Sequence, residues 1–201
     1  KDRSNLTAAQ AHLTRTEVCQ PAMAALGLAL SEFLGTLGVS PDVALGHSLG
    51  EFAAAASGGM LSAEDSVRLV ARRGQLMNAL KLEDPGAMLA VMAEASVVEP
   101  LIEQLNASLS DSGSAAASKT GLRLAPQQHV ALANHNHPTQ VVLSGTTAGI
   151  DAAQKLLGDA GLKCTRLDVS HAFHSPLMAG IDVGMQKLIA ELAVHPAQRP
   201  V

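Results

Sequence analysis

One serine in this chain stands in a setting that favours nucleophilic chemistry. Ser48 lies between two glycines in Gly46-His47-Ser48-Leu49-Gly50, which has the pattern G-x-S-x-G. Such a pattern indicates a nucleophile elbow, a sharp turn from strand to helix that exposes a serine hydroxyl at its tip. The turn needs small neighbours, because the serine backbone is strained and the chain reverses tightly around it. The predicted role of Ser48 is therefore attack on a substrate.

The segments on either side of the turn support this interpretation, since the pentapeptide alone also occurs in loops rich in glycine and serine. An apolar run, Val43–Leu45, predicts the strand, and the alanine-rich stretch Ala53–Ala56 predicts the helix. The N-terminus of that helix and the Leu49 backbone N–H would point at the same place. A negative charge that develops there on a substrate oxygen would be stabilised by the N–H and by the helix dipole.

An arginine offers a second candidate group. Ser62-Ala63-Glu64-Asp65 resembles a capping box and predicts a helix that runs to about Leu80. On a helical wheel Arg73 lies only about 40° from Leu69, inside the apolar stripe. A buried guanidinium must find an anion or other acceptors, because an unpaired buried charge is very costly. Arg73 is thus either a ligand for an anion or a side chain whose head group reaches out to water.

The elements that position these groups fall into two predicted domains. Pro21 is expected to open a helix that Gly38 ends, with apolar residues at three- and four-residue steps (Met23, Leu26, Leu30, Phe33, Leu34 and Leu37). After Asp84-Pro85-Gly86 the pattern changes to strand, helix, two strands, helix and strand (87–92, 97–105, 130–133, 140–143, 147–160 and 163–169). This order is ferredoxin-like. Residues 108–120, rich in Ser, Ala and Gly, are expected to be a mobile insertion.

Composition excludes several classes of protein. The chain has 201 residues, of which 47% are hydrophobic and 16% charged, so a folded globular body is expected. A net charge of −4, with three Phe and neither Tyr nor Trp, disfavours nucleic-acid binding. Two cysteines are too few for a disulfide framework. No signal segment and no uninterrupted apolar run of membrane-spanning length is evident, so a cytoplasmic protein is expected.

Five motifs in order resemble the acyltransferase family that includes malonyl-CoA:acyl carrier protein transacylases and the acyltransferase domains of polyketide synthases. They are Gly46–Glu51, Ala71–Met77, Gly86–Val91, Asn136-His137-Pro138 with Val141–Gly145, and His171–Ser175. The resemblance covers about residues 20–178. It implies an α/β-hydrolase-like large domain, with a parallel sheet flanked by helices, over residues 1–86 and 170–201. A ferredoxin-like small domain is inserted over residues 87–169.

The resemblance also implies roles for individual residues. Ser48 matches the nucleophile, His174 the general base, and Arg73 the arginine that holds the free carboxylate of a malonyl group. The implied reaction moves a malonyl unit from CoA to the phosphopantetheine thiol of an acyl carrier protein through an acyl-serine, with the Leu49 N–H as oxyanion donor. The family needs no bound cofactor, and a neighbouring ketosynthase domain is a candidate second partner.

The four residues that end at the proposed base bear on substrate choice. In polyketide synthases this stretch correlates with the extender unit, and here it reads His171-Ala172-Phe173-His174, which resembles the malonyl type. Phe173 would fill the space that an α-methyl branch needs. His171 is therefore grouped with Phe173 as a substrate-binding residue. His47, directly before the nucleophile, would either contact substrate or merely stabilise the turn.

Two departures from the family pattern and three rival interpretations remain. The family's N-terminal Gly-Gln-Gly segment and the residue that orients the histidine are not in this sequence, and the chain lacks an initial Met, so we expect an excised piece, incomplete at both ends.

A serine esterase or thioesterase would need a triad acid, for which Asp168 is the candidate. A non-catalytic docking domain is the second rival. His135 and His137 make a metal site conceivable, but no acidic partner stands at ligand spacing, so none is predicted.

Overall fold

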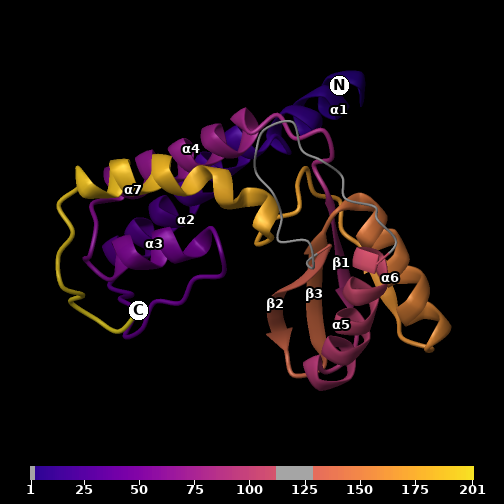
Figure 1. Ribbon diagram of the computed structural model, residues 1–201. Helices are drawn as coiled ribbons and strands as arrows, with labels where there is room; N and C mark the ends of the chain where they lie inside the picture. The colour runs from indigo at the N-terminus through magenta and orange to yellow at the C-terminus, as the bar shows by residue number, and fades with distance from the viewer. Residues whose placement is uncertain (1–2, 112–128) are drawn as a thin grey trace. The chain divides into compact units, whose positions relative to one another are not determined.

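The computed structural model describes residues 3–111 and 129–201, which form two compact units. The first comprises Lys1–Ala79 and Ile181–Val201, and the second comprises Leu80–Gly180. Figure 1 shows the elements of each unit. In its described residues the first unit contains only helices: α1 (Arg3–Leu13), α2 (Thr16–Thr36), α3 (Gly50–Ser57), α4 (Ala63–Ala79) and α7 (Asp182–Ala190). The strands all belong to the second unit.

Helix α4 forms as its sequence predicts. The Ser62 hydroxyl accepts a hydrogen bond from the Asp65 N–H at 2.9 Å and donates to the Asp65 carboxylate at 2.8 Å, which caps the first turn. Leu69, Val70 and Met77 are almost completely buried. Helix α4 therefore presents an apolar stripe to the interior of the first unit, where it packs against α2, α3 and α7.

Helix α2 begins earlier than predicted. Pro21 does not open it; the helix starts at Thr16, and Pro21 lies inside it. The residues of α2 that are buried are Thr16, Gln20 and Ala24, each one turn after the last. Because the expected start omitted the first of these turns, the sequence interpretation missed the face by which α2 packs on α4.

The predicted apolar stripe of α2 is present but largely exposed: Met23, Leu26, Leu30 and Phe33 each keep more than half of their accessible surface. Length and composition alone, 21 residues with an 18-residue window of mean hydropathy 1.3, would allow α2 to cross a membrane. A mostly buried core helix and a signal sequence near the N-terminus pass the same test; 11% of this window is buried, and α2 carries acidic residues at Glu17 and Glu32. The buried polar residues that α2 turns towards α4 fit the role of a packed helix.

The strand predicted for Val43–Leu45 does not form. This segment has no secondary structure, and Leu45 is 90% exposed. A strand needs a hydrogen-bonded neighbour, and the described part of the first unit offers no other strand. The Ala44 N–H instead donates to the Pro200 carbonyl at 3.0 Å. The parallel sheet predicted for the large domain is accordingly not seen in the described residues.

The second unit is built on a four-stranded antiparallel sheet with the strand order β2-β3-β1-β4. Its elements follow one another as β1 (Ala87–Val91), α5 (Ala95–Asp111), β2 (Val130–His137), β3 (Gln140–Gly145), α6 (Thr147–Asp159) and β4 (Cys164–Arg166). A short 3-10 helix, η1 (Pro176–Ile181), ends it. The predicted order of strand, helix, two strands, helix and strand is thus confirmed. Of the predicted insertion, residues 108–111 belong to α5, and residues 112–120 lie outside the described residues.

The core of the second unit joins the sheet to the two helices. Leu89 and Leu143 on neighbouring central strands are fully buried with Ile150 and Leu157 of α6, and Val98 of α5 joins the same cluster. Helices α5 and α6 contact each other on one face of the sheet (Figure 1). This packing makes the sheet a firm support for the loops at its ends, one of which carries His174.

Candidate active site

The turn around Ser48 has the left-handed backbone and the following helix of a nucleophile elbow, without the preceding strand. Ser48 adopts a left-handed backbone conformation with φ of 53°, which is uncommon for a residue with a side chain. A Cβ on Gly46 would lie 2.3 Å from the backbone nitrogen of Glu51, so only glycine fits there. Gly50 is different, because nothing lies within 4 Å of the Cβ it lacks. The expected need for small neighbours is therefore confirmed at Gly46 and wrong at Gly50.

Helix α3 begins at Gly50, two residues after the serine. The Gly50 N–H donates to the His47 carbonyl at 2.9 Å and the Glu51 N–H to the Ser48 carbonyl at 3.1 Å. Leu49 is the residue that precedes the helix, so its N–H belongs to the N-terminal end where the positive end of the helix dipole lies. Ser48 and Leu49 are half-buried and His47 is exposed. The turn thus places Ser48 immediately before the N-terminal end of α3.

Arg73 lies in the same unit as the elbow, half-buried on α4. Its Nη1 donates to Oε1 of Gln20 at 2.9 Å. Burial lowers the pKa of Arg73, and the carboxylate of Glu51, three residues after Ser48, acts in the opposite direction. An arginine remains protonated under these conditions. The guanidinium of this half-buried side chain is thus bonded to a neutral acceptor inside the unit, and its role as a ligand for an anion stays a prediction.

Gln20 and Glu51 are the two residues near Arg73 that the sequence interpretation missed. Gln20 is 5% exposed and bonds Thr16 one turn earlier on α2. A polar residue on the buried face of an amphipathic helix is a signal, because burial of an amide requires partners. A helix that starts at Pro21 leaves Gln20 outside it, and this hides the signal.

His174 lies in a loop of the second unit that is held to the start of β1. Like Ser48, it has a left-handed backbone, with φ of 58°. The next residue, Ser175, is buried and donates from its Oγ to the Ala172 carbonyl at 2.6 Å. The Ala172 N–H in turn donates to the Pro85 carbonyl at 2.8 Å. These bonds fix the backbone on which the exposed His174 ring stands.

The other two residues of this motif contact each other. The rings of His171 and Phe173 are 5.9 Å apart between centroids and inclined at 47°. Nδ1 of His171 lies 3.0 Å from the Ser170 hydroxyl. Both rings are half-buried, whereas Asp168, the candidate triad acid of the esterase interpretation, is exposed. The motif therefore presents a half-buried aromatic pair next to the exposed His174.

The candidate residues are divided between the two units. His47, Ser48, Leu49 and Arg73 belong to the first unit, and His171, Phe173 and His174 belong to the second. Each group is positioned by its own unit: the first by the α3 turn and the α2–α4 contact, the second by the loop anchored at Pro85.

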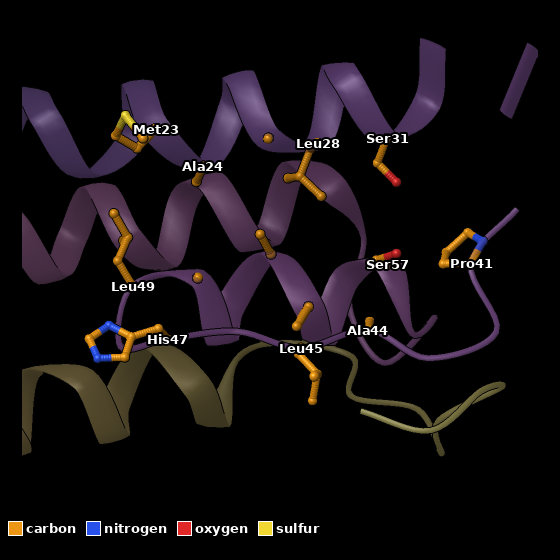
Figure 2. A pocket seen from close by; sticks show the side chains of 14 residues that line it. Met23, Ala24, Leu28, Ser31, Pro41, Ala44, Leu45, His47, Leu49 and Ser57 are labelled. Carbon is orange, nitrogen blue, oxygen red and sulfur yellow. The ribbon is translucent and has the colours of Figure 1, made fainter. Parts of the chain in front are cut away.

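A hollow of about 520 Å³ lies beside the elbow in the first unit (Figure 2). Helix α2 lines it with Met23, Ala24, Leu28 and Ser31, and the elbow contributes His47 and Leu49. Figure 2 shows that its lining is mainly apolar. Neither Ser48 nor Arg73 lines this hollow. The hollow therefore lies along the apolar face of α2 and reaches the elbow through His47 and Leu49, without including Ser48 or Arg73.

The structure offers no support for a metal centre. Among the described residues, no group of three or more His, Cys, Asp and Glu side chains could hold a metal ion. Nδ1 of His137 accepts from the Thr139 N–H at 3.2 Å, which ties this histidine into the turn between β2 and β3. Cys19 and Cys164 are both free thiols.

Comparison with known proteins shows the family of the chain. The profile of the family described as "Acyl transferase domain" matches residues 4–200. The chain is 33% identical over 193 residues to a malonyl CoA-acyl carrier protein transacylase of Bacillus subtilis, covering 94% of this chain and 55% of that protein. It is 34% identical over 189 residues to the spectinabilin polyketide synthase system protein NorB of Streptomyces orinoci, covering 94% of this chain and 8% of that one.

Solved structures show the same relationship. The acyltransferase domain from the second module of the salinomycin polyketide synthase superposes with a TM-score of 0.78 at 38% identity, over 96% of this chain and 40% of that one. The transacylase fabD from Coxiella burnetii gives a TM-score of 0.80 at 31% identity, over 96% and 56%. The chain thus spans about half the length of the transacylases that it matches. Its fold is α/β, and it belongs to the acyl transferase domain family.

Proposed function

We propose that the protein carrying this chain transfers a malonyl unit from CoA to the phosphopantetheine thiol of an acyl carrier protein, in polyketide or fatty acid biosynthesis. The observation that supports it best is the strained turn at Ser48, in the same unit as a half-buried Arg73. The first is a nucleophile beside N–H donors, and the second is a cation suited to a carboxylate. Malonyl thioesters offer both a carbonyl and a free carboxylate.

The reaction proceeds in two halves. His174 takes the proton of Ser48, whose Oγ attacks the thioester carbonyl of malonyl-CoA; the C–S bond then breaks, and His174 gives the proton to the sulfur, so that CoA leaves as the thiol. The Leu49 N–H and the N-terminus of α3 stabilise the oxyanion of each tetrahedral intermediate. In the second half, the carrier protein's thiol gives its proton to His174 and attacks the acyl-serine, which releases Ser48 and forms the new thioester.

The remaining candidate residues determine which acyl-CoA substrate is accepted. The planar fork of Arg73 binds both oxygens of the malonyl carboxylate. Phe173, held against His171, occupies space that an α-methyl branch would need, which favours malonyl over methylmalonyl units. His47 is exposed beside the nucleophile and is a candidate contact for the CoA portion of the substrate.

The fold and the partners belong to the same proposal. We propose an α/β-hydrolase-like large domain over residues 1–86 and 170–201, with a ferredoxin-like domain inserted over residues 87–169. The support is the elbow in one and the antiparallel order β2-β3-β1-β4 in the other. The acyl carrier protein is the obligatory partner, a neighbouring ketosynthase domain is a second one, and no bound cofactor is required.

The deciding experiment follows the fate of the acyl group in the intact protein that carries this chain. With labelled malonyl-CoA and a phosphopantetheinylated carrier protein, the proposal predicts label on the carrier protein. Release of the label as free malonate in the presence of carrier protein would instead identify a thioesterase. Absence of any acyl-enzyme would favour a docking domain. Ser48→Ala serves as the control for background transfer.

A further inference from the structure

Gln20 occupies a position that lets it fix the direction of the Arg73 guanidinium. It is 5% exposed, and its Oε1 accepts from Nη1 of Arg73 at 2.9 Å. We propose that Gln20 is a positioning residue that fixes the orientation of the Arg73 guanidinium without neutralising its charge, and thereby sets the preference for acyl groups that carry a carboxylate. The inference rests on the proposed function, because it deepens the role given there to Arg73.

Both ends of the Gln20 amide are engaged. Its Nε2 donates to the Thr16 hydroxyl at 2.7 Å and lies 3.3 Å from Sδ of Met77. A guanidinium only donates hydrogen bonds, so the atom of Gln20 that faces Arg73 must be its carbonyl oxygen. The Thr16 hydroxyl in turn accepts from the amide nitrogen. Rotation of the amide would break both bonds, so its orientation is fixed.

A close crossing of two helices brings these groups together. Thr16 and Gln20 lie one turn apart on α2, and Arg73 and Met77 lie one turn apart on α4. Between them, a Cβ on Gly74 would lie 2.7 Å from the Thr16 carbonyl oxygen. The two backbones therefore meet at this glycine, and the approach puts Gln20 within hydrogen-bonding distance of Arg73.

The neutrality of Gln20 matters as much as its bond. Among the described residues, Gln20 is the only hydrogen-bond acceptor of Arg73, which has five N–H donors. A carboxylate at this position would neutralise the guanidinium and compete with the acyl carboxylate. An amide orients the planar group and leaves its charge, and its other donors, for the substrate. The carboxylate of the exposed Glu51 also acts on the charge of Arg73. Among the described residues, Glu51 makes no hydrogen bond to Arg73.

The test measures selectivity in the intact protein that carries this chain. Acylation of Ser48 is followed by quenched-flow mass spectrometry with malonyl-CoA and with acetyl-CoA, for the wild type, Gln20→Glu and Gln20→Met. Gln75→Glu is the matched control, since Oε1 of Gln75 lies 3.5 Å from Nη1 of Arg72 on the exposed side of the same helix. Thr16→Val removes the second bond of the amide and leaves Gln20 in place.

In Gln20→Glu we expect kcat/KM for malonyl-CoA to fall by about tenfold or more, mainly through a higher KM, while the acetyl-CoA rate changes by less than about threefold. Gln20→Met and Thr16→Val should show smaller losses in the same direction, and Gln75→Glu should leave the ratio unchanged. A parallel fall for both substrates in every Gln20 and Thr16 variant would show a merely structural role and overturn the inference. No acyl-serine in the wild type would overturn the proposed function, and this inference with it.

Discussion

Gly46 and Glu51 approach so closely that a Cβ on Gly46 would lie 2.3 Å from the Glu51 backbone nitrogen. The elbow is therefore built by a contact between the residue that precedes the turn and the first turn of α3. The strained backbone of Ser48 lies between these two points. Any side chain at position 46 must push the helix away from the turn and move the nucleophile with it.

The first prediction compares the two glycines of the motif, Gly46, where a Cβ would collide with backbone, and Gly50, where it would not. Gly46→Ala should abolish detectable acylation of Ser48 and lower the melting temperature, because the new methyl group collides with backbone that has no room to move. Gly50→Ala should keep both properties, since nothing lies within 4 Å of its Cβ and alanine favours the helix by up to about 1 kcal/mol. Thermal unfolding and acylation mass spectrometry check the pair; equal effects of both changes would contradict it.

The second prediction concerns the crossing of α2 and α4. Gly74→Ala places a methyl group 2.7 Å from the Thr16 carbonyl oxygen and should lower the free energy of unfolding by about 1–3 kcal/mol. Gly27→Ala, within α2 where a Cβ meets nothing within 4 Å, should instead be neutral or raise it by up to about 1 kcal/mol. Urea denaturation of both variants provides the measurement. A neutral Gly74→Ala would show that the helices do not meet at this residue.

The third prediction addresses the loop that carries His174. Ser175→Ala removes the 2.6 Å bond to the Ala172 carbonyl and should cost about 1–2 kcal/mol of stability. It should also slow acylation, because the left-handed backbone of His174 loses the neighbour that holds it. Ser108→Ala is the matched control: its hydroxyl makes the same kind of bond to the Leu105 carbonyl at an exposed position of α5. The idea fails if Ser175→Ala acylates at the wild-type rate.

The fourth prediction concerns the choice of acyl group. Phe173→Ala opens space beside His171 and should raise the rate with methylmalonyl-CoA relative to malonyl-CoA by about tenfold, by removing a steric obstacle. Phe33→Ala, which deletes a ring that is 58% exposed on α2, should leave the ratio as it is. Competition between the two substrates in one reaction measures the ratio directly. An unchanged ratio in Phe173→Ala would remove Phe173 from the specificity site.

The sequence predicted those elements whose determinants are local. The second unit was anticipated element by element, because its buried strands and helices carry apolar runs bounded by turn residues. Ser62 and Asp65 likewise predict the start of α4. The angle of Arg73 on the helical wheel placed it correctly towards the interior. In each case the signal lies within a few residues of the feature that it predicts.

The misses depend on partners distant in the sequence. The strand expected at Val43–Leu45 needs a hydrogen-bonded neighbour that its own residues do not supply. Pro21 predicts a helix start, but α2, which packs on α4, begins one turn earlier, at Thr16. Gln20 acquires its significance only from Arg73, 53 positions later in the chain. The pattern of apolar residues within one helix cannot predict a hydrogen bond to a residue on another helix.

The central claim is that Ser48 carries the acyl group, and intact-mass measurement tests it most directly. The intact protein is mixed briefly with malonyl-CoA, acetyl-CoA or methylmalonyl-CoA, beside Ser48→Ala and Arg73→Ala. We predict a malonyl adduct that disappears in Ser48→Ala, and a preference that shifts towards acetyl once Arg73 is replaced. No adduct with any of the three substrates, or an adduct that persists in Ser48→Ala, would contradict the account.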